Sequence, residues 1–139
     1  MKKTSDVWNE ILEKPPSKLS LVEQNVKRTN IFLFEFECGG WLYNLSPASG
    51  VGNDWVELRE TAKSIGAVGG ASVGRQVLRI ASIVERLEIQ QATVWGEFLS
   101  AVSPNGEIEK IEKLITAETE DLWDKLKDYT VRHFKCKRE

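Results

Sequence analysis

Aromatic rings and an amide, which are side chains that often contact ligands, gather within a few residues early in the chain. Trp41, Tyr43 and Asn44 follow the pair Gly39-Gly40 and precede a loop rich in Ser, Pro and Gly at residues 46–52. An Asn in this position commonly holds the loop by hydrogen bonds from its side chain to the backbone, which is the role we favour for Asn44. The alternative is a cleft in which Trp41, Tyr43 and Asn44 bind a small molecule.

Carboxylates concentrate in the last third of the chain, where they could attract a cationic partner. Residues 107–128 contain four lysines and the following acidic residues: Glu107, Glu109, Glu112, Glu118, Glu120, Asp121, Asp124 and Asp128. The simpler interpretation is a solvated helix surface with internal salt bridges. The alternative is a docking surface for a basic protein, because clustered carboxylates steer and orient cationic partners. In that case Glu112, Glu120, Asp121 and Asp124 are the candidate contact residues.

Residues suited to nucleophilic or metal chemistry are sparse. His133 is the only histidine, and neither Cys38 nor Cys136 belongs to a CxxC motif. A structural zinc site normally needs four Cys or His ligands, and a catalytic nucleophile needs an adjacent base. We therefore expect no catalytic residues, no metal and no cofactor, and we predict that the protein is not an enzyme.

Length and charge narrow the class of protein further. A chain of 139 residues with 41% hydrophobic and 29% charged residues is typical of a single globular domain, here residues 1–139. A formal net charge of −2 does not favour direct binding to nucleic acid. No apolar run approaches the roughly 20 residues that span a bilayer, and no signal peptide is recognisable. We expect a cytoplasmic protein that does not bind membranes, and a homo-oligomer is compatible with the sequence.

The N-terminal third predicts two helices. Ser5 or Asp6 can cap the first, and Pro15-Pro16 ends it. The sequence Ser20-Leu-Val-Glu23 has the pattern of a capping box, so a second helix is expected to start near residue 21 and to end at the Gly39-Gly40 pair. The first helix should bury Trp8, Ile11 and Leu12, which are spaced along one helical face. The second contains the most apolar run of the chain, residues 31–36, and is the expected centre of the fold.

The remaining chain also predicts helices. One runs from Asn53 or Asp54 to Ile65, where Gly66 closes it, and the glycines at residues 66–74 are interpreted as a corner between helices. Further helices are expected at residues 73–87 and 108–115, and Thr116 can cap a last one. The last helix should bury Leu122, Trp123, Leu126, Tyr129 and Phe134. The predicted fold is an all-α, compact single-domain bundle of about six helices around a central apolar helix. Its expected large core anchors are Phe32, Phe36, Trp41, Trp55 and Trp123.

Several of these segments carry a resemblance to a known family. Residues 37–44, Glu-Cys-Gly-Gly-Trp-Leu-Tyr-Asn, resemble the Asn-Gly-Gly-Phe-x-x-aromatic-x-Asn motif of the DNA-mimic protein C-terminal-domain-like family, a bacterial family. Residues 64–67, 77–81 and 122–129 also fit its layout, so the resemblance covers about residues 19–134. It implies an all-helical fold and, for one branch, imitation of DNA by carboxylates. Cys38 replaces the family's Asn, and lysines interrupt the acidic span.

Together these observations favour a small bacterial-type protein that acts by binding another protein. The first alternative is a DNA mimic or immunity-type inhibitor, whose acidic helices occupy a basic, DNA-binding partner. The second is an enzyme or small-molecule binder that uses a cleft near Trp41 and Asn44.

Overall fold

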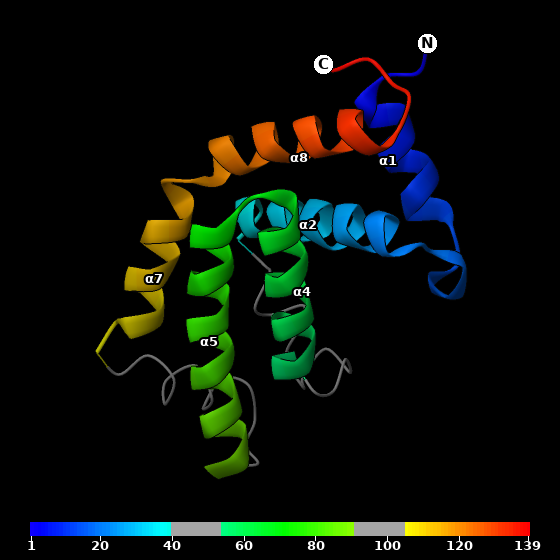
Figure 1. Ribbon diagram of the computed structural model, residues 1–139. Helices are drawn as coiled ribbons and strands as arrows, with labels where there is room; N and C mark the ends of the chain where they lie inside the picture. The colour runs from blue at the N-terminus through cyan, green and yellow to red at the C-terminus, as the bar shows by residue number, and fades with distance from the viewer. Residues whose placement is uncertain (40–53, 91–104) are drawn as a thin grey trace.

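The computed structural model describes residues 1–39, 54–90 and 105–139, and these residues confirm the predicted all-α bundle of about six helices. In Figure 1, α4 (Asp54–Val68), α5 (Ala71–Gln90) and α7 (Glu107–Thr116) run alongside one another, and α8 (Thr119–His133) crosses one end of this group. The remaining elements are α1 (Thr4–Glu13), the short 3-10 helix η1 (Pro16–Lys18) and α2 (Leu21–Glu37). Helix α2 contacts α1, α4 and α8, which agrees with its predicted central place.

None of the helices in the described part of the chain has both the length and the apolar character required to cross a bilayer.

Helix α1 begins one residue before the predicted caps. Its N-cap is Lys3, whose backbone amide donates to the Asp6 carboxylate at 2.9 Å, while the Ser5 amide donates to the Glu139 carboxylate at 2.7 Å. The prediction that Ser5 or Asp6 is the N-cap was wrong, because the helix starts earlier and Asp6 instead accepts from the Lys3 amide as the third helical residue. Of the face predicted to be buried, Ile11 is buried and Trp8 is partly buried against the core, whereas Leu12 is exposed; Val7 is buried as well.

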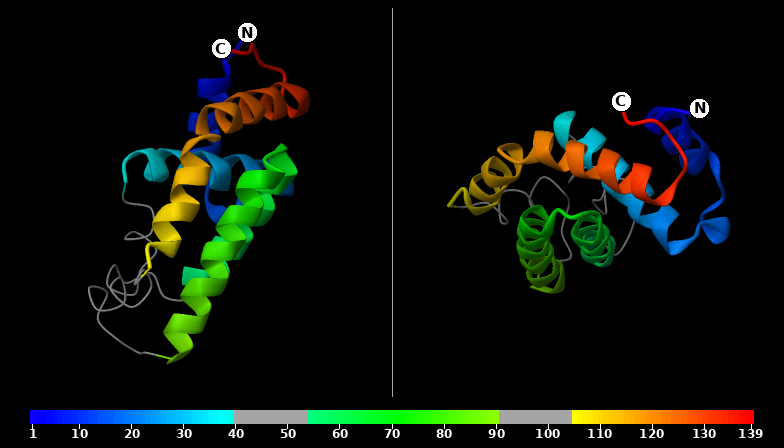
Figure 2. Two further views of the ribbon diagram at one scale, coloured as in Figure 1. Left: turned by 90° about the vertical axis from the view of Figure 1, so that its left-hand side faces the viewer. Right: turned by 45° about the horizontal axis from the view of Figure 1, so that its top comes forward.

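The two chain ends are joined at this point. Lys3 and Lys137 form an isolated parallel β-bridge, and the Lys137 amide donates to the Lys2 carbonyl at 2.7 Å. Figure 2 shows the two ends side by side in both views. Further along α1, Trp8 stacks against Trp123 with ring centroids 5.8 Å apart, and its indole N–H donates to the Thr130 hydroxyl at 2.8 Å. These contacts hold α1 against α8.

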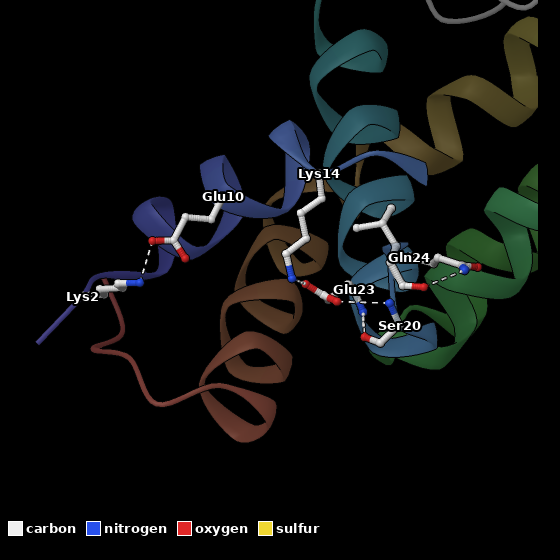
Figure 3. Close-up of polar contacts among 7 residues, drawn as sticks. Lys2, Glu10, Lys14, Ser20, Glu23 and Gln24 are labelled. Carbon is white, nitrogen blue, oxygen red and sulfur yellow. Dashed lines mark hydrogen bonds and ion pairs between the residues drawn. The ribbon is translucent and has the colours of Figure 1, made fainter. Parts of the chain in front are cut away.

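Helix α2 starts where the capping box predicted. The Glu23 amide donates to the Ser20 hydroxyl, and the Ser20 amide donates to the Glu23 carboxylate, both at 3.1 Å. Figure 3 shows that Lys14, which follows α1, also reaches this carboxylate, with Nζ and Oε2 2.5 Å apart. One buried carboxylate therefore caps α2 and ties it to the end of α1. The Lys14 hydrogen bond, and after it the Ser20 amide, lowers the pKa of Glu23.

This arrangement predicts a pH-dependent effect of Glu23→Gln. The folded-state pKa of Glu23 lies below its unfolded value, so the ionised carboxylate stabilises the fold above an unfolded-state pKa of about 4.3. This stabilisation is lost as the pH falls through the folded-state pKa. We expect Glu23→Gln to reduce the free energy of unfolding at neutral pH and the deficit to shrink toward about pH 3. Urea melts at a series of pH values measure it, with the exposed Glu13→Gln as control; a deficit independent of pH would contradict the expectation.

The apolar run of α2 is divided between the core and the surface. Phe32 and Leu33 are buried, whereas Ile31 and Phe34 are exposed. Of the predicted core anchors, Phe32 is confirmed. Phe36 and Trp123 are partly buried and pack against the core cluster at its edge. Trp41 and the Trp55 side chain lie outside the described residues.

Helices α4 and α5 form a tight antiparallel pair. Helix α4 continues through Gly66 to Val68, three residues beyond the predicted end, because Gly69, with φ +112, is the residue that takes the left-handed conformation. The Gly69 amide donates to the Gly66 carbonyl and the Gly70 amide to the Ile65 carbonyl, which is the Schellman pattern of a helix end. The predicted corner between helices is thus confirmed. Arg59 and Glu85 form an ion pair between the two helices.

The last two helices meet in a short turn. Thr116 was predicted to cap the final helix, but it is the last residue of α7 and its hydroxyl donates to the Glu112 carbonyl. Glu118 is the N-cap of α8 instead. The predicted buried face is confirmed for Leu122, Leu126 and Tyr129, while Phe134 follows the helix and is partly buried.

Candidate functional site

The first predicted site, Trp41, Tyr43 and Asn44, lies outside the described residues, so the proposed cleft there stays a prediction.

The acidic candidates of the last third lie on two helices. Glu112 is on α7 and is partly buried, whereas Glu120, Asp121 and Asp124 are exposed on α8. Asp121 pairs with Lys125 at 2.9 Å, one turn along the same helix. Asp124 pairs with Arg138 at 3.2 Å. Asp121 and Asp124 are therefore already engaged with cations of the same chain.

Arg138 is the residue that sequence reasoning missed in this region. Its guanidinium donates to Asp128 at 2.7 Å and to Asp124 at 3.2 Å, and the Asp128 hydrogen bond in particular raises the pKa of Arg138. The next residue, Glu139, accepts from Ser5 and Thr4, and the Ser5 hydrogen bonds lower its pKa. The basic end of the chain thus lies on the acidic face of α8 and reaches α1. Its basic composition was the one sequence signal for this contact.

The residues that were weighed for catalysis do not form a reactive group in the described parts of the chain. The His133 ring packs on Tyr129 with centroids 4.4 Å apart. Cys38 is exposed, whereas Cys136 is buried, and burial raises the pKa of the Cys136 thiol. Across residues 1–39, 54–90 and 105–139, no three His, Cys, Asp or Glu side chains are placed to hold a metal ion.

The outward side of α2 carries features that the sequence analysis did not single out. Ile31 is 37% exposed and Phe34 is 64% exposed, and Leu12 of α1 is 36% exposed. These three side chains line a groove of about 490 Å³, whose remaining lining residues are Asn9, Asn30 and Glu35. Ile31 and Phe34 are three residues apart and so are neighbours on the helix surface. We call Leu12, Ile31 and Phe34 the apolar patch.

A second hollow lies on the other side of Ile31, between η1, α2 and α4. It has a volume of about 390 Å³, and its apolar wall consists of Pro16, Leu19 and Ile31. Its polar lining is Gln24, Lys27, Arg28 and, from α4, Glu57. The Gln24 amide donates to the Leu19 carbonyl at 3.3 Å, which fixes one edge of the hollow (Figure 3). We call this hollow the α2–α4 pocket.

Comparisons with known proteins add no family to this description: the chain matches no protein-family model, no curated protein and no solved structure. The resemblance to the DNA-mimic protein C-terminal-domain-like family therefore stays a prediction that rests on its motif residues.

Proposed function

We propose that this chain is a non-enzymatic protein-binding module, and that it contacts its partner through the apolar patch on α1 and α2. The observation that carries the proposal is the exposure of Leu12, Ile31 and Phe34 around one groove. A large aromatic side chain that is mostly exposed next to two other apolar residues is unfavourable in water. Such clusters commonly mark protein interaction sites, and aromatic residues often dominate their binding energy.

The chemistry of the groove suits an amphipathic helix of the partner. Helix α2 presents Ile31 and Phe34 at the spacing i, i+3, which places them side by side on one face. A partner helix with apolar anchors would cover Ile31 and Phe34. Asn9 and Asn30 at the rim can hydrogen-bond to the polar edge of such a helix. We therefore expect an amphipathic helical segment with apolar anchors and a polar edge as the occupant.

The alternative of a DNA mimic receives less support. A mimic has to offer carboxylates to a basic partner, and each ion pair within the chain competes with that partner. Asp121 is paired with Lys125, and Asp124 and Asp128 share Arg138. Glu120 is the exposed candidate best placed to test this alternative.

For the cellular compartment we propose the cytoplasm, because free thiols such as those of Cys38 and Cys136 persist in a reducing environment.

The test compares single substitutions in binding to a purified partner. Candidates are captured from host lysate, and their affinities for the wild type, Phe34→Ala, Leu114→Ala and Glu120→Lys are then measured by calorimetry. Leu114 is the matched control, because it is 50% exposed on α7, outside the apolar patch. We expect Phe34→Ala to weaken binding about tenfold or more, as for a central aromatic contact, and Leu114→Ala to leave it unchanged.

Two outcomes would count against this proposal. A loss of affinity for Glu120→Lys with no loss for Phe34→Ala would favour the acidic docking surface instead. Equal losses for Phe34→Ala and Leu114→Ala would show that the effect does not come from the apolar patch.

A further inference from the structure

The α2–α4 pocket contains cations that no carboxylate of the described chain neutralises. Lys27 and Arg28 are each partly buried, and neither takes part in any ion pair among the described residues. Two other lysines at α1 do find carboxylates, since Lys2 pairs with Glu10 and Lys14 with Glu23. A partly buried cation loses hydration, which an anion can replace. The pair Lys27 and Arg28 is therefore suited to an anionic group.

A carboxylate from a second helix lines the same pocket. Glu57 of α4 is exposed and lines the pocket with Arg28, yet the two do not approach within ion-pair distance. A ligand with only a negative charge would be repelled by Glu57, and a ligand with only a positive charge would be repelled by Lys27 and Arg28. A ligand with both charges meets a partner on each wall.

The apolar lining gives the third element of recognition. Ile31, which borders the pocket, also borders a smaller hollow of about 120 Å³, to which Phe32 and Leu58 add apolar surface and Glu35 and Thr61 add polar groups. Both hollows share Arg28, Ile31 and Glu57, so the smaller one adjoins the charged walls. An apolar side chain that enters it buries surface against Phe32 and Leu58.

We propose that the α2–α4 pocket binds an α-amino acid with an apolar side chain. Its carboxylate contacts Lys27 and Arg28, its ammonium group contacts Glu57, and its side chain lies against Ile31. Arg28 can bind the carboxylate through two parallel N–H groups, whereas Lys27 contributes a point charge. This assignment does not depend on the proposed protein-binding function, although Ile31 borders both sites. It concerns binding only and includes no chemical step.

The test uses three related compounds on the wild-type protein. Calorimetry or chemical-shift titration compares L-phenylalanine with 3-phenylpropionate, which lacks the ammonium group, and with phenethylamine, which lacks the carboxylate. We expect L-phenylalanine to bind most tightly, by about tenfold over each analogue, because each analogue leaves one wall unpaired. Absence of saturable L-phenylalanine binding, or equal affinities for the three compounds, would overturn the proposal.

Two charge-removing substitutions give a crossed pattern that non-specific binding would not produce. Arg28→Gln should lower the affinity for both L-phenylalanine and 3-phenylpropionate about tenfold. Glu57→Gln should lower the affinity for L-phenylalanine, whose ammonium group loses its partner. It should raise the affinity for 3-phenylpropionate, because it removes a negative charge near the carboxylate of that compound. Arg75→Gln, an exposed arginine on α5, is the matched control and should change neither affinity. If Glu57→Gln lowered the affinity for both compounds, the assignment would be contradicted. If a variant unfolded, the comparison of the three compounds on the wild-type protein would still test the proposal.

Discussion

We expect Leu33→Ala to lower the free energy of unfolding by about 2–5 kcal/mol, the usual cost of deleting a buried Leu side chain. Leu33 has no exposed surface, and it lies on α2, which contacts α1, α4 and α8. Few neighbours can move into the space that it leaves, because each belongs to a helix that other contacts hold in place. The expected loss is therefore a large part of the total stability of a domain of this size. Urea or guanidinium melts measure the change directly.

Phe34→Ala is the matched control for Leu33→Ala. Phe34 is the next residue along α2, but its side chain lies on a different face of the helix and is 64% exposed. The substitution also removes a larger side chain than Leu33→Ala does. We expect a change within about 0.5 kcal/mol, as for exposed positions generally. A large loss at Phe34 together with a small loss at Leu33 would mean that the opposite face of α2 is buried. The same melt also checks that the Phe34→Ala variant used in the binding experiment is folded.

We expect Gly70→Ala to destabilise the fold by about 1–3 kcal/mol through overpacking. A Cβ at this position would lie 2.6 Å from Leu122 Cδ1 and 2.9 Å from Ile65 Cγ2, both of which are buried. Ala gains about 0.4–1 kcal/mol from the lower entropy of the unfolded chain, which is too little to offset two such contacts. Gly66→Ala is the matched control with the opposite sign, because nothing lies within 4 Å of its Cβ and it sits inside α4. We expect it to stabilise the protein by about 0.5–1 kcal/mol.

A double-mutant cycle shows whether Leu122 is the cause of the Gly70 effect. Leu122→Ala alone should cost about 2–5 kcal/mol, and it also removes the atom nearest to the new Cβ. The double variant Gly70→Ala with Leu122→Ala should therefore cost less than the two single changes together, with a coupling of at least about 0.5 kcal/mol. Additive effects would mean that α8 does not pack against the turn between α4 and α5.

The features that the sequence predicted well depend on neighbouring residues. The start of α2 was predictable because Ser20 and Glu23 satisfy each other's backbone amides within one turn. The corner after α4 was predictable because glycine marks a helix end, although composition alone could not say which glycine takes the left-handed conformation. The acceptor of the Ser5 amide in the first turn of α1 was missed because it is Glu139, and no local pattern indicates a partner at the other end of the chain.

The candidate site was less predictable for a similar reason. Clustered carboxylates on α8 are visible in the sequence, but their ion pairs with Arg138 depend on the path of the chain after His133. The apolar patch depends on which face of α2 the other helices cover. The run at residues 31–36 is apolar on both faces, so the sequence offers no signal that Leu33 is buried and Phe34 is exposed. The α2–α4 pocket needs residues from two helices and could not be seen in either alone.

The pairing of the chain ends has a consequence for the order of folding. Ser5 and Glu139 are separated by 134 residues, whereas Arg59 and Glu85 of the α4–α5 pair are separated by 26. Closing the longer loop costs about 1.5 kcal/mol more in chain entropy, since the cost rises with the logarithm of loop length. Contacts within α4 and α5 therefore form early, and those of Lys3, Ser5 and Glu139 are expected after the rate-limiting step. A substitution at Glu139 should consequently speed unfolding and leave the folding rate almost unchanged.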